Sequence, residues 1–233
     1  MTDVQPVPPG VVAHVQDRDI TRLARDVSRR LGIFHSNCLD IGCGRSRHDI
    51  WFQRFERSEG DRRYTAVDAD PEIVKELRAA GVHACLPGEV GSSSADLALC
   101  LEVVEHIPEE EIPAFLQFVE SKTRKLAVFT TPNLEYWDVS APGNARAKAE
   151  IEGLRWIPDH VLTLTDDATD PHGHKQVYTP ERLRTQLEAA FPARTWGIEI
   201  YRAWPWTIGD VPNGRTHVLY FKIFAVAWRR TSP

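Results

Sequence analysis

The side chains most capable of chemistry in this sequence are two glutamates and two histidines. Glu102, Glu105 and His106 stand at positions i, i+3 and i+4, and residues with this spacing on a helical turn face the same way. Two carboxylates and an imidazole that converge can bind a divalent cation, with His174 as the candidate fourth ligand. Oxygen ligands suit Mg²⁺ or Mn²⁺, although histidine is more typical of transition-metal sites. His106 and His174 are also the candidate general bases for a reaction that removes a proton.

A glycine turn is the second chemical feature. The run CLDIGCG places Gly42 and Gly44 directly after a short apolar stretch that contains Asp40. Because glycine has no Cβ, a ligand can lie against the backbone there. A strand, a turn with two glycines and then a helix is how a parallel α/β sheet presents N–H groups to a nucleotide-like ligand. The spacing lacks the third glycine of the dinucleotide fingerprint and the Gly-Lys-Ser/Thr of the P-loop.

Asp68 is the third candidate, because it ends a short strand predicted for residues 64–67. An acid at the tip of the second strand of such a sheet can accept hydrogen bonds from both ribose hydroxyls of a nucleoside. The alternative is an aspartate that only caps a helix or closes a loop. The glycine turn upstream favours the ribose role.

Strands and helices are predicted to alternate around these motifs, and a pair of strands joined by a Pro/Gly-rich turn closes the chain. This order predicts an α/β fold with a Rossmann-like, doubly wound sheet of seven strands, one of them antiparallel. The predicted strands cover about residues 38–41, 64–67, 82–86, 96–101, 125–130, 195–203 and 217–228. The predicted helices cover about residues 17–31, 49–55, 71–80, 108–123 and 179–190.

Composition and length narrow the class of protein. The 233 residues carry a net charge of −5, which gives no electrostatic signature of binding to nucleic acid or to an anionic membrane. The four cysteines form no C-x-x-C pair and indicate reduced thiols in a cytoplasmic protein. Residues 1–15 are predicted to be a flexible N-terminal arm without a signal-peptide pattern, and 16–233 a single domain with a lid or substrate insert at about 133–178. No apolar run is long enough to span a membrane.

Three further motifs follow the glycine turn. They are the LEVVEHIP run from Leu101 to Pro108, the FTTPN run from Phe129 to Asn133, and His174 shortly before the VYTP run from Val177 to Pro180. Together with the glycine turn, these motifs resemble class I S-adenosylmethionine-dependent methyltransferases over about residues 17 to 228. The resemblance implies the Rossmann-like fold, methyl transfer as the activity and S-adenosylmethionine as the cofactor.

The resemblance also implies which residues hold the cofactor. The glycine turn would hold the methionine end, Asp68 the ribose, and the loops near Leu86 and Leu101 the adenine. The residues so implied are Asp40, Gly42, Cys43, Gly44, Asp68, Ala69, Leu86, Leu101 and Glu102. The family often has an acid after the third strand that contacts the adenine amine. This chain has Leu86-Pro87-Gly88 there, so a backbone group or Glu89 would take that role.

The E-x-x-E-H…H set made by Glu102, Glu105, His106 and His174 resembles two groups of metal-dependent O-methyltransferases. One group methylates the 3′-terminal 2′-hydroxyl of small RNAs, and the other modifies sugars, quinols and other small molecules. We expect a small-molecule hydroxyl acceptor, with a saccharide or glycoside first and a phenol or quinol second. The acidic net charge, the aromatic and acidic residues of the insert, and the VYTP run favour it. The RNA-modifying enzymes usually have Phe-Glu-Trp-Thr at that run.

Other interpretations stay open at this point. RNA is the second acceptor, although the insert lacks the basic clusters that RNA phosphates need. E-x-x-E-H also occurs in family members without a metal, where the glutamates cap the following helix and the histidine packs near the cofactor. A non-catalytic S-adenosylmethionine-binding protein is the alternative from another class. Neither nucleic acid nor a membrane is an expected partner, and a homodimer is an open alternative.

Overall fold

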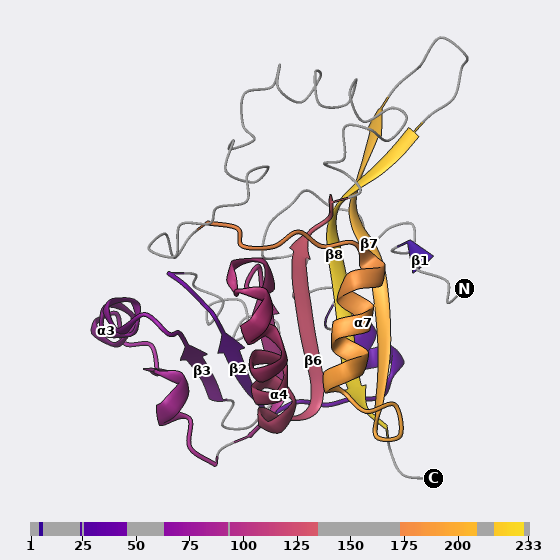
Figure 1. Cartoon of the computed structure of the whole chain (residues 1–233). Coiled ribbons are helices and arrows are strands. Elements are labelled where there is room, and N and C mark those ends of the chain that lie inside the picture. The colour runs from indigo at the N-terminus through magenta and orange to yellow at the C-terminus, as the bar shows by residue number, and fades with distance from the viewer. Residues whose placement is uncertain are drawn as a thin grey trace.

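The structure is a computed structural model (Figure 1). It describes residues 5–6, 24, 26–45, 63–92, 94–134, 173–208 and 217–230. The helix predicted for residues 49–55 lies outside these ranges, and so does most of the predicted insert, from residue 135 to residue 172. The predictions of a flexible arm, a single domain and a lid therefore stay predictions.

A single mixed sheet of eight strands forms the centre of the described part of the chain. The strands are β1 (Gln5–Pro6), β2 (Asn37–Ile41), β3 (Arg63–Val67), β4 (Ala84–Cys85), β5 (Ala95–Leu101), β6 (Thr123–Pro132), β7 (Trp196–Ile208) and β8 (His217–Arg229). Their order is β1-β7-β8-β6-β5-β2-β3-β4. Only β8 runs antiparallel to its neighbours in this described sheet, so the predicted doubly wound sheet with one antiparallel strand is confirmed. The two-residue β1 is added beside β7.

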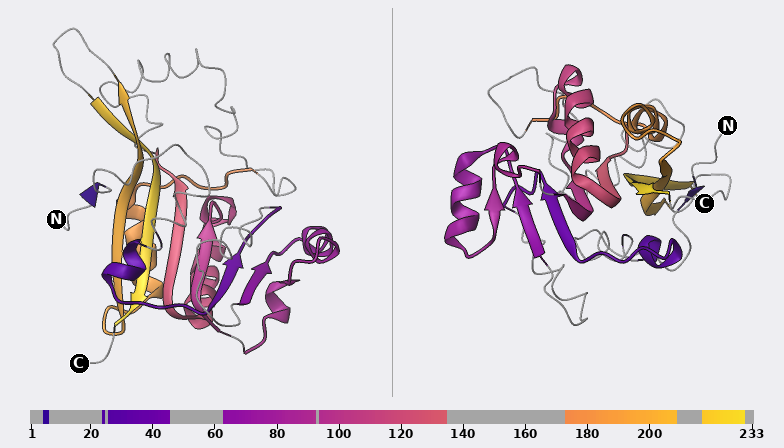
Figure 2. Two further views of the ribbon diagram at one scale, coloured as in Figure 1. Left: turned by 180° about the vertical axis from the view of Figure 1, so that it is seen from behind. Right: turned by 90° about the horizontal axis from the view of Figure 1, so that it is seen from below.

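Helices cover both faces of this sheet. Helices α4 (Ile112–Lys122) and α7 (Pro180–Ala190) cover one face, as Figure 1 shows. Helical residues 26–30 lie on the opposite face (Figure 2), where the core also includes α3 (Pro71–Ala79). Neighbouring residues of a strand point to opposite faces, and accordingly Cys38 and Leu39 of β2 belong to different hydrophobic clusters.

Local capping explains where the helices begin. The Asp70 side chain accepts a hydrogen bond of 2.8 Å from the Glu72 N–H, and Pro71 opens α3. Thr179 and Pro180 do the same for α7, with a 3.2 Å bond from the Arg182 N–H to the Thr179 hydroxyl oxygen. These caps are local sequence signals, so both helices begin at the predicted residues.

The structure also describes every cysteine and the length of the helices in the described ranges. All four cysteines lie in the described ranges, are buried and form no disulfide. Among the described residues, no helix is long and apolar enough to cross a membrane.

Candidate active site

The candidate residues gather at the carboxyl edge of the parallel strands. Strands β2, β3, β5 and β6 run in parallel, so their carboxyl ends meet at one edge of the sheet. The glycine turn follows β2, Asp68 follows β3 and Glu102 follows β5. Ligands of doubly wound sheets bind at this edge.

The glycine turn needs glycine for two different reasons. Gly42 has φ +72°, and a Cβ on it would lie 2.6 Å from Val103 Cγ2, so the loop after β5 packs directly on this residue. Gly44 has φ +55°, but a Cβ there would meet no atom of the described residues within 4 Å. Gly42 therefore lies in close contact with the loop after β5, whereas no described residue crowds Gly44.

Asp68 lies against the glycine turn. Its Oδ2 accepts a 2.8 Å hydrogen bond from the Gly44 N–H, and its Oδ1 accepts a 3.0 Å bond from the Asp70 N–H. The carboxylate is half-buried, and each of its oxygens keeps further lone pairs for a ligand. Ala69, which follows it, is exposed. Asp68 thus holds the turn in shape and can still accept hydrogen bonds from a ribose.

Asp40 lies beneath the turn rather than in it. It is buried, and its Oδ2 accepts a 2.5 Å hydrogen bond from the Tyr64 hydroxyl. Burial, together with the nearby carboxylates of Asp40 and Asp68, raises the pKa of the Cys43 thiol. Cys43 is therefore a protonated, buried part of the turn and no nucleophile.

The residues predicted near the adenine form a small network of their own. The Leu86 N–H donates a 2.8 Å hydrogen bond to Glu89 Oε2, and Arg78 Nη2 donates one of 2.7 Å to the same oxygen. The Leu86 bond, and then Arg78, lower the pKa of Glu89 against a smaller opposing effect of burial. Leu86 and Leu101 are half-buried.

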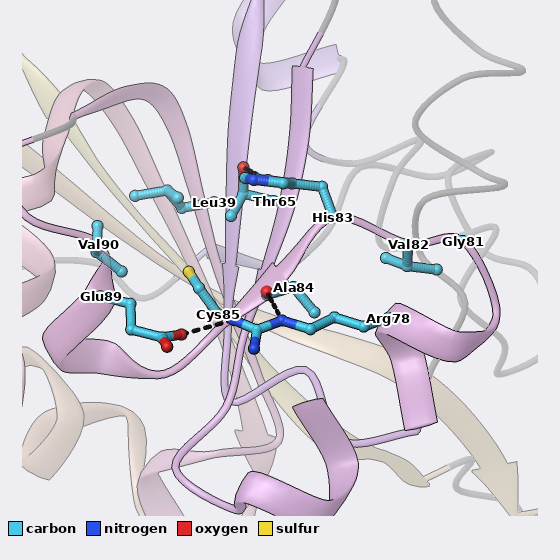
Figure 3. Close-up of a pocket in the computed structure, with 10 residues that line it drawn as sticks. All are labelled: Leu39, Thr65, Arg78, Gly81, Val82, His83, Ala84, Cys85, Glu89 and Val90. Carbon is cyan, nitrogen blue, oxygen red and sulfur yellow. Dashed lines mark hydrogen bonds and ion pairs between the residues drawn. The ribbon is translucent and has the colours of Figure 1, made fainter. Parts of the chain in front are cut away.

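A cavity of about 710 Å³ lies on the sheet face beside β4. Figure 3 shows Arg78 reaching across it toward Glu89, while Leu39, Cys85 and Val90 line its apolar side. None of its described lining residues comes from the glycine turn or from the histidine pair. The cavity is therefore separate from the candidate catalytic groups.

Glu105, His106 and His174 come together above the carboxyl edge. One ligand atom from each of them lies within 4.8 Å of the others. The two imidazole rings meet edge to face, with 4.9 Å between their centroids. His106 Nδ1 lies 3.2 Å from the Gly173 carbonyl oxygen, which can only accept a hydrogen bond. Nδ1 therefore carries the proton, and Nε2 is the proton acceptor of the neutral His106 ring.

The Glu105 carboxyl is enclosed by protein. It is 1% exposed, and its Oε2 accepts a 3.0 Å hydrogen bond from the Thr131 hydroxyl. Within the part of the chain that the structure describes, Oε1 is buried and makes no hydrogen bond. Burial raises the pKa of Glu105 to about 8. A buried acceptor that lacks a donor and faces two imidazoles fits a bound cation.

Glu102 does not join this cluster, and the prediction of a single helical face is corrected here. The 3₁₀ turn begins at Val104, and Glu102 precedes it with φ +57°. Its Oε2 instead contacts Lys222 Nζ in an ion pair. Burial lowers the pKa of Lys222, whereas the contact with Glu102 favours its charged form.

The start and end of the predicted insert are held side by side. Asn133 forms a parallel bridge with Tyr178, and the Leu134 N–H donates a 2.7 Å bond to the Tyr178 carbonyl. The N–H groups of Lys175 and Gln176 both donate to the Glu105 carbonyl, at 2.7 and 3.1 Å. These contacts place His174, because they fasten residues 174–178 to the turn that carries Glu105.

Two residues of the site were missed by the sequence reasoning. Thr131 is hydrogen-bonded to Glu105, and Lys222 is paired with Glu102. A signal existed for Lys222, which is a single charge in the apolar run Tyr220 to Phe224. The FTTPN run contained Thr131, but nothing local showed which threonine faces Glu105.

Comparison with known proteins identifies the family. The model of the family described as "Methyltransferase domain" matches residues 14–190. The chain belongs to this family of methyltransferase domains. No curated protein matches it significantly.

Solved methyltransferase structures share the fold at low sequence identity. The plantazolicin methyltransferase BamL, in complex with a triazolic desmethylPZN analog and SAH, has a TM-score of 0.59 at 9% identity, and the match covers 91% of this chain and 84% of the BamL chain. An S-adenosylmethionine-dependent methyltransferase from Clostridium acetobutylicum has a TM-score of 0.55 at 12% identity, with 92% of each chain covered. The Pnkp1/Rnl/Hen1 RNA repair complex has a TM-score of 0.53 at 15% identity and covers 92% of this chain and 42% of its own.

Proposed function

We propose that this methyltransferase acts on a hydroxyl group of a small polar acceptor, a saccharide or glycoside first and a phenol or quinol second. The observation that carries the proposal is the convergence of Glu105, His106 and His174 at the sheet edge that also holds the glycine turn. An alcohol must lose its proton as its oxygen attacks, and an imidazole beside the acceptor can take that proton.

The chain's own residues divide the work of methyl transfer. S-adenosylmethionine supplies a methyl group on a sulfonium, which is an intrinsically good leaving group. The glycine turn and Asp68 align the donor, as an in-line displacement requires. His106 is oriented by its contact with the Gly173 carbonyl, so its Nε2 is the atom that would take the proton. His174 lies against the His106 ring and is the alternative base.

A divalent cation, Mg²⁺ or Mn²⁺, is part of the proposal. Glu105, His106 and His174 would hold it, and the buried Oε1 of Glu105 supports this assignment. Each imidazole can hold only one role at a time, so a histidine that binds the cation would not also act as the base. Bound there, the cation would lower the pKa of a coordinated hydroxyl. Glu102 is outside this set because Lys222 engages its carboxylate, so we propose three protein ligands instead of four.

RNA with a 3′-terminal ribose is the second candidate acceptor. The E-x-x-E-H…H set favours it, and one structure with a similar fold is part of an RNA repair complex. The net charge of −5 argues against it, because RNA binding depends on the neutralisation of phosphates by Lys and Arg.

An acceptor screen tests the proposal. The protein would be incubated with methyl-labelled S-adenosylmethionine and glycosides, phenols, a quinol or short 3′-hydroxyl RNAs, each with Mg²⁺, Mn²⁺ or EDTA. We expect label on an oxygen atom of a glycoside or phenol. Label on RNA alone would establish the second candidate, and label on nitrogen or sulfur would overturn both. Asp68→Asn is the matched control, because it should reduce turnover with every acceptor.

A further inference from the structure

A partly buried lysine reaches the carboxyl edge of the sheet from β8. Lys222 is in register with Pro132 of β6 and with Ala203 of β7, so it lies where the parallel strands end. Its Nζ contacts Glu102 Oε2, although the two residues are 120 positions apart. The Lys222 side chain is 14% exposed and that of Glu102 34%.

The backbone of Glu102 is strained and held in place. Among the described residues it is the only non-glycine residue with a positive φ, at +57°. Such a conformation is unfavourable for a residue with a Cβ and persists only where the surroundings impose it. The Glu102 N–H donates to Thr130, whose carbonyl oxygen lies at 3.0 Å and whose hydroxyl oxygen lies at 3.2 Å. β6 thus holds the backbone of Glu102, and β8 holds its side chain.

Glu102 is the first residue of the loop after β5. This loop contacts the glycine turn and also carries Glu105 and His106. The next residue, Val103, packs closely on Gly42. A Cβ added to Gly42 would lie only 2.6 Å from Val103 Cγ2. The 3₁₀ turn Val104–His106 follows at once and carries Glu105 and His106. The position of Glu102 therefore affects the cofactor turn and the candidate base together.

We propose that Lys222 is a positioning residue for methyl transfer. Through Glu102 it sets the loop that packs on the Gly42 turn and presents His106 to the acceptor. The proposal concerns the methyltransferase site itself, so it depends neither on the identity of the acceptor nor on a cation.

The alternative is that the Lys222–Glu102 ion pair only stabilises the fold. In that case its removal would lower the free energy of unfolding, but the protein that remains folded would bind the cofactor with unchanged affinity. Lys125 provides the matched control, because its Nζ lies 3.1 Å from Asp96 Oδ2 in a similar lysine–carboxylate pair at the amino edge of the sheet.

Titration calorimetry with S-adenosylhomocysteine separates a positioning role from a purely structural one. The folded K222M protein should bind this probe about 10–100-fold more weakly, by analogy with the loss seen when residues that support metal ligands are removed. K222R, which preserves the pair, should restore binding to within about threefold of the wild type. K125M should lose stability but keep the wild-type affinity. A folded K222M that binds within about twofold of the wild type would overturn the proposal.

A second variant covers the case in which K222M does not fold. Glu102→Gly removes the carboxylate and relieves the backbone strain, because glycine adopts a positive φ readily. It should fold and yet show the same loss of affinity for S-adenosylhomocysteine. Wild-type affinity in E102G would rule out a positioning role for the pair. The probe contains no acceptor, so failure of the acceptor screen would not affect this result.

Discussion

Gly42 is the residue at which the cofactor turn tolerates the least change. Its φ of +72° disfavours any side chain, and a Cβ would also press on Val103. We expect Gly42→Ala to lower the free energy of unfolding by the backbone cost of about 1–2 kcal/mol plus about 1–3 kcal/mol for overpacking. Urea unfolding measures the total loss of unfolding free energy. Titration with S-adenosylhomocysteine should also show weaker binding.

Gly81→Ala is a control that separates the backbone cost from the overpacking cost. Gly81 has φ +79°, and a Cβ added to it would meet no atom of the described residues within 4 Å, so we expect Gly81→Ala to carry the backbone cost alone. Equal destabilisation by the two substitutions would show that the contact between Val103 and Gly42 does not constrain the turn.

At the residue scale, local motifs predicted the positions of the site residues well, but contacts between residues distant in the chain could not be predicted. The positions of Gly42, Gly44 and Asp68 followed from strand ends and turn chemistry, and the structure brings them together, with a hydrogen bond between Gly44 and Asp68. The separation of Glu102 from His106 could not be predicted, because it depends on a positive φ and on Lys222 of a distant strand.

At the scale of elements, the amino edge of the sheet depends on Asp96. This buried carboxylate at the start of β5 accepts from the Ser36 N–H at 3.1 Å and from Lys125 at 3.1 Å, with Arg124 also in contact. Burial opposes its ionisation, but the Ser36, Lys125 and Arg124 contacts outweigh it and lower the pKa of Asp96. We expect Asp96→Asn to cost about 1–3 kcal/mol at neutral pH, since the lysine and arginine are about half exposed.

The pH dependence of that loss has a definite sign. A carboxylate with a lowered folded-state pKa stabilises the protein above its unfolded pKa of about 3.9, and the effect fades as the pH falls through the folded value. The difference in unfolding free energy between wild type and D96N should therefore be constant from about pH 5 to 8 and shrink below about pH 4. Glu72→Gln, which removes an exposed pair with Lys75, should cost no more than about 0.5 kcal/mol. A loss in D96N that persists unchanged at about pH 3 would contradict this account.

The elements themselves were largely predictable, for physical reasons that can be named. β5 is buried along nearly its whole length, so it appears in the sequence as an apolar run, and the Asp70 and Thr179 caps mark two helix starts. The third predicted strand was too long, because only Ala84–Cys85 pair with β3. The bridge between Asn133 and Tyr178 joins residues far apart in the chain and left no local signal.

At the scale of the whole molecule, a bound cation should stabilise the fold. A ligand at about 100 times its dissociation constant adds about 2.7 kcal/mol, which raises the melting temperature of a domain of this size by about 5–10 °C. We expect Mn²⁺ to produce such a rise in the wild type, EDTA to reverse it, and Glu105→Gln to abolish it.

Glu110→Gln is the control for this effect, because Glu110 is exposed and lies outside the Glu105–His106–His174 cluster. It should retain the response to Mn²⁺. If neither Mn²⁺ nor Mg²⁺ changes the wild-type melting temperature, the cation is no part of the proposed function. The histidines would then act only as candidate bases.

The central claim is that His106 and His174 act on the acceptor hydroxyl at the carboxyl edge of the sheet. The most direct measurement is kcat/KM for the acceptor found in the screen, compared between wild type, His106→Ala and His83→Ala. His83 is exposed near β4 and lies outside the cluster, so its substitution should leave kcat/KM unchanged. We predict a loss of about 10²–10⁴-fold in folded H106A, as expected for removal of the imidazole that takes the transferred proton. A folded H106A with kcat/KM within about twofold of the wild type would contradict the account.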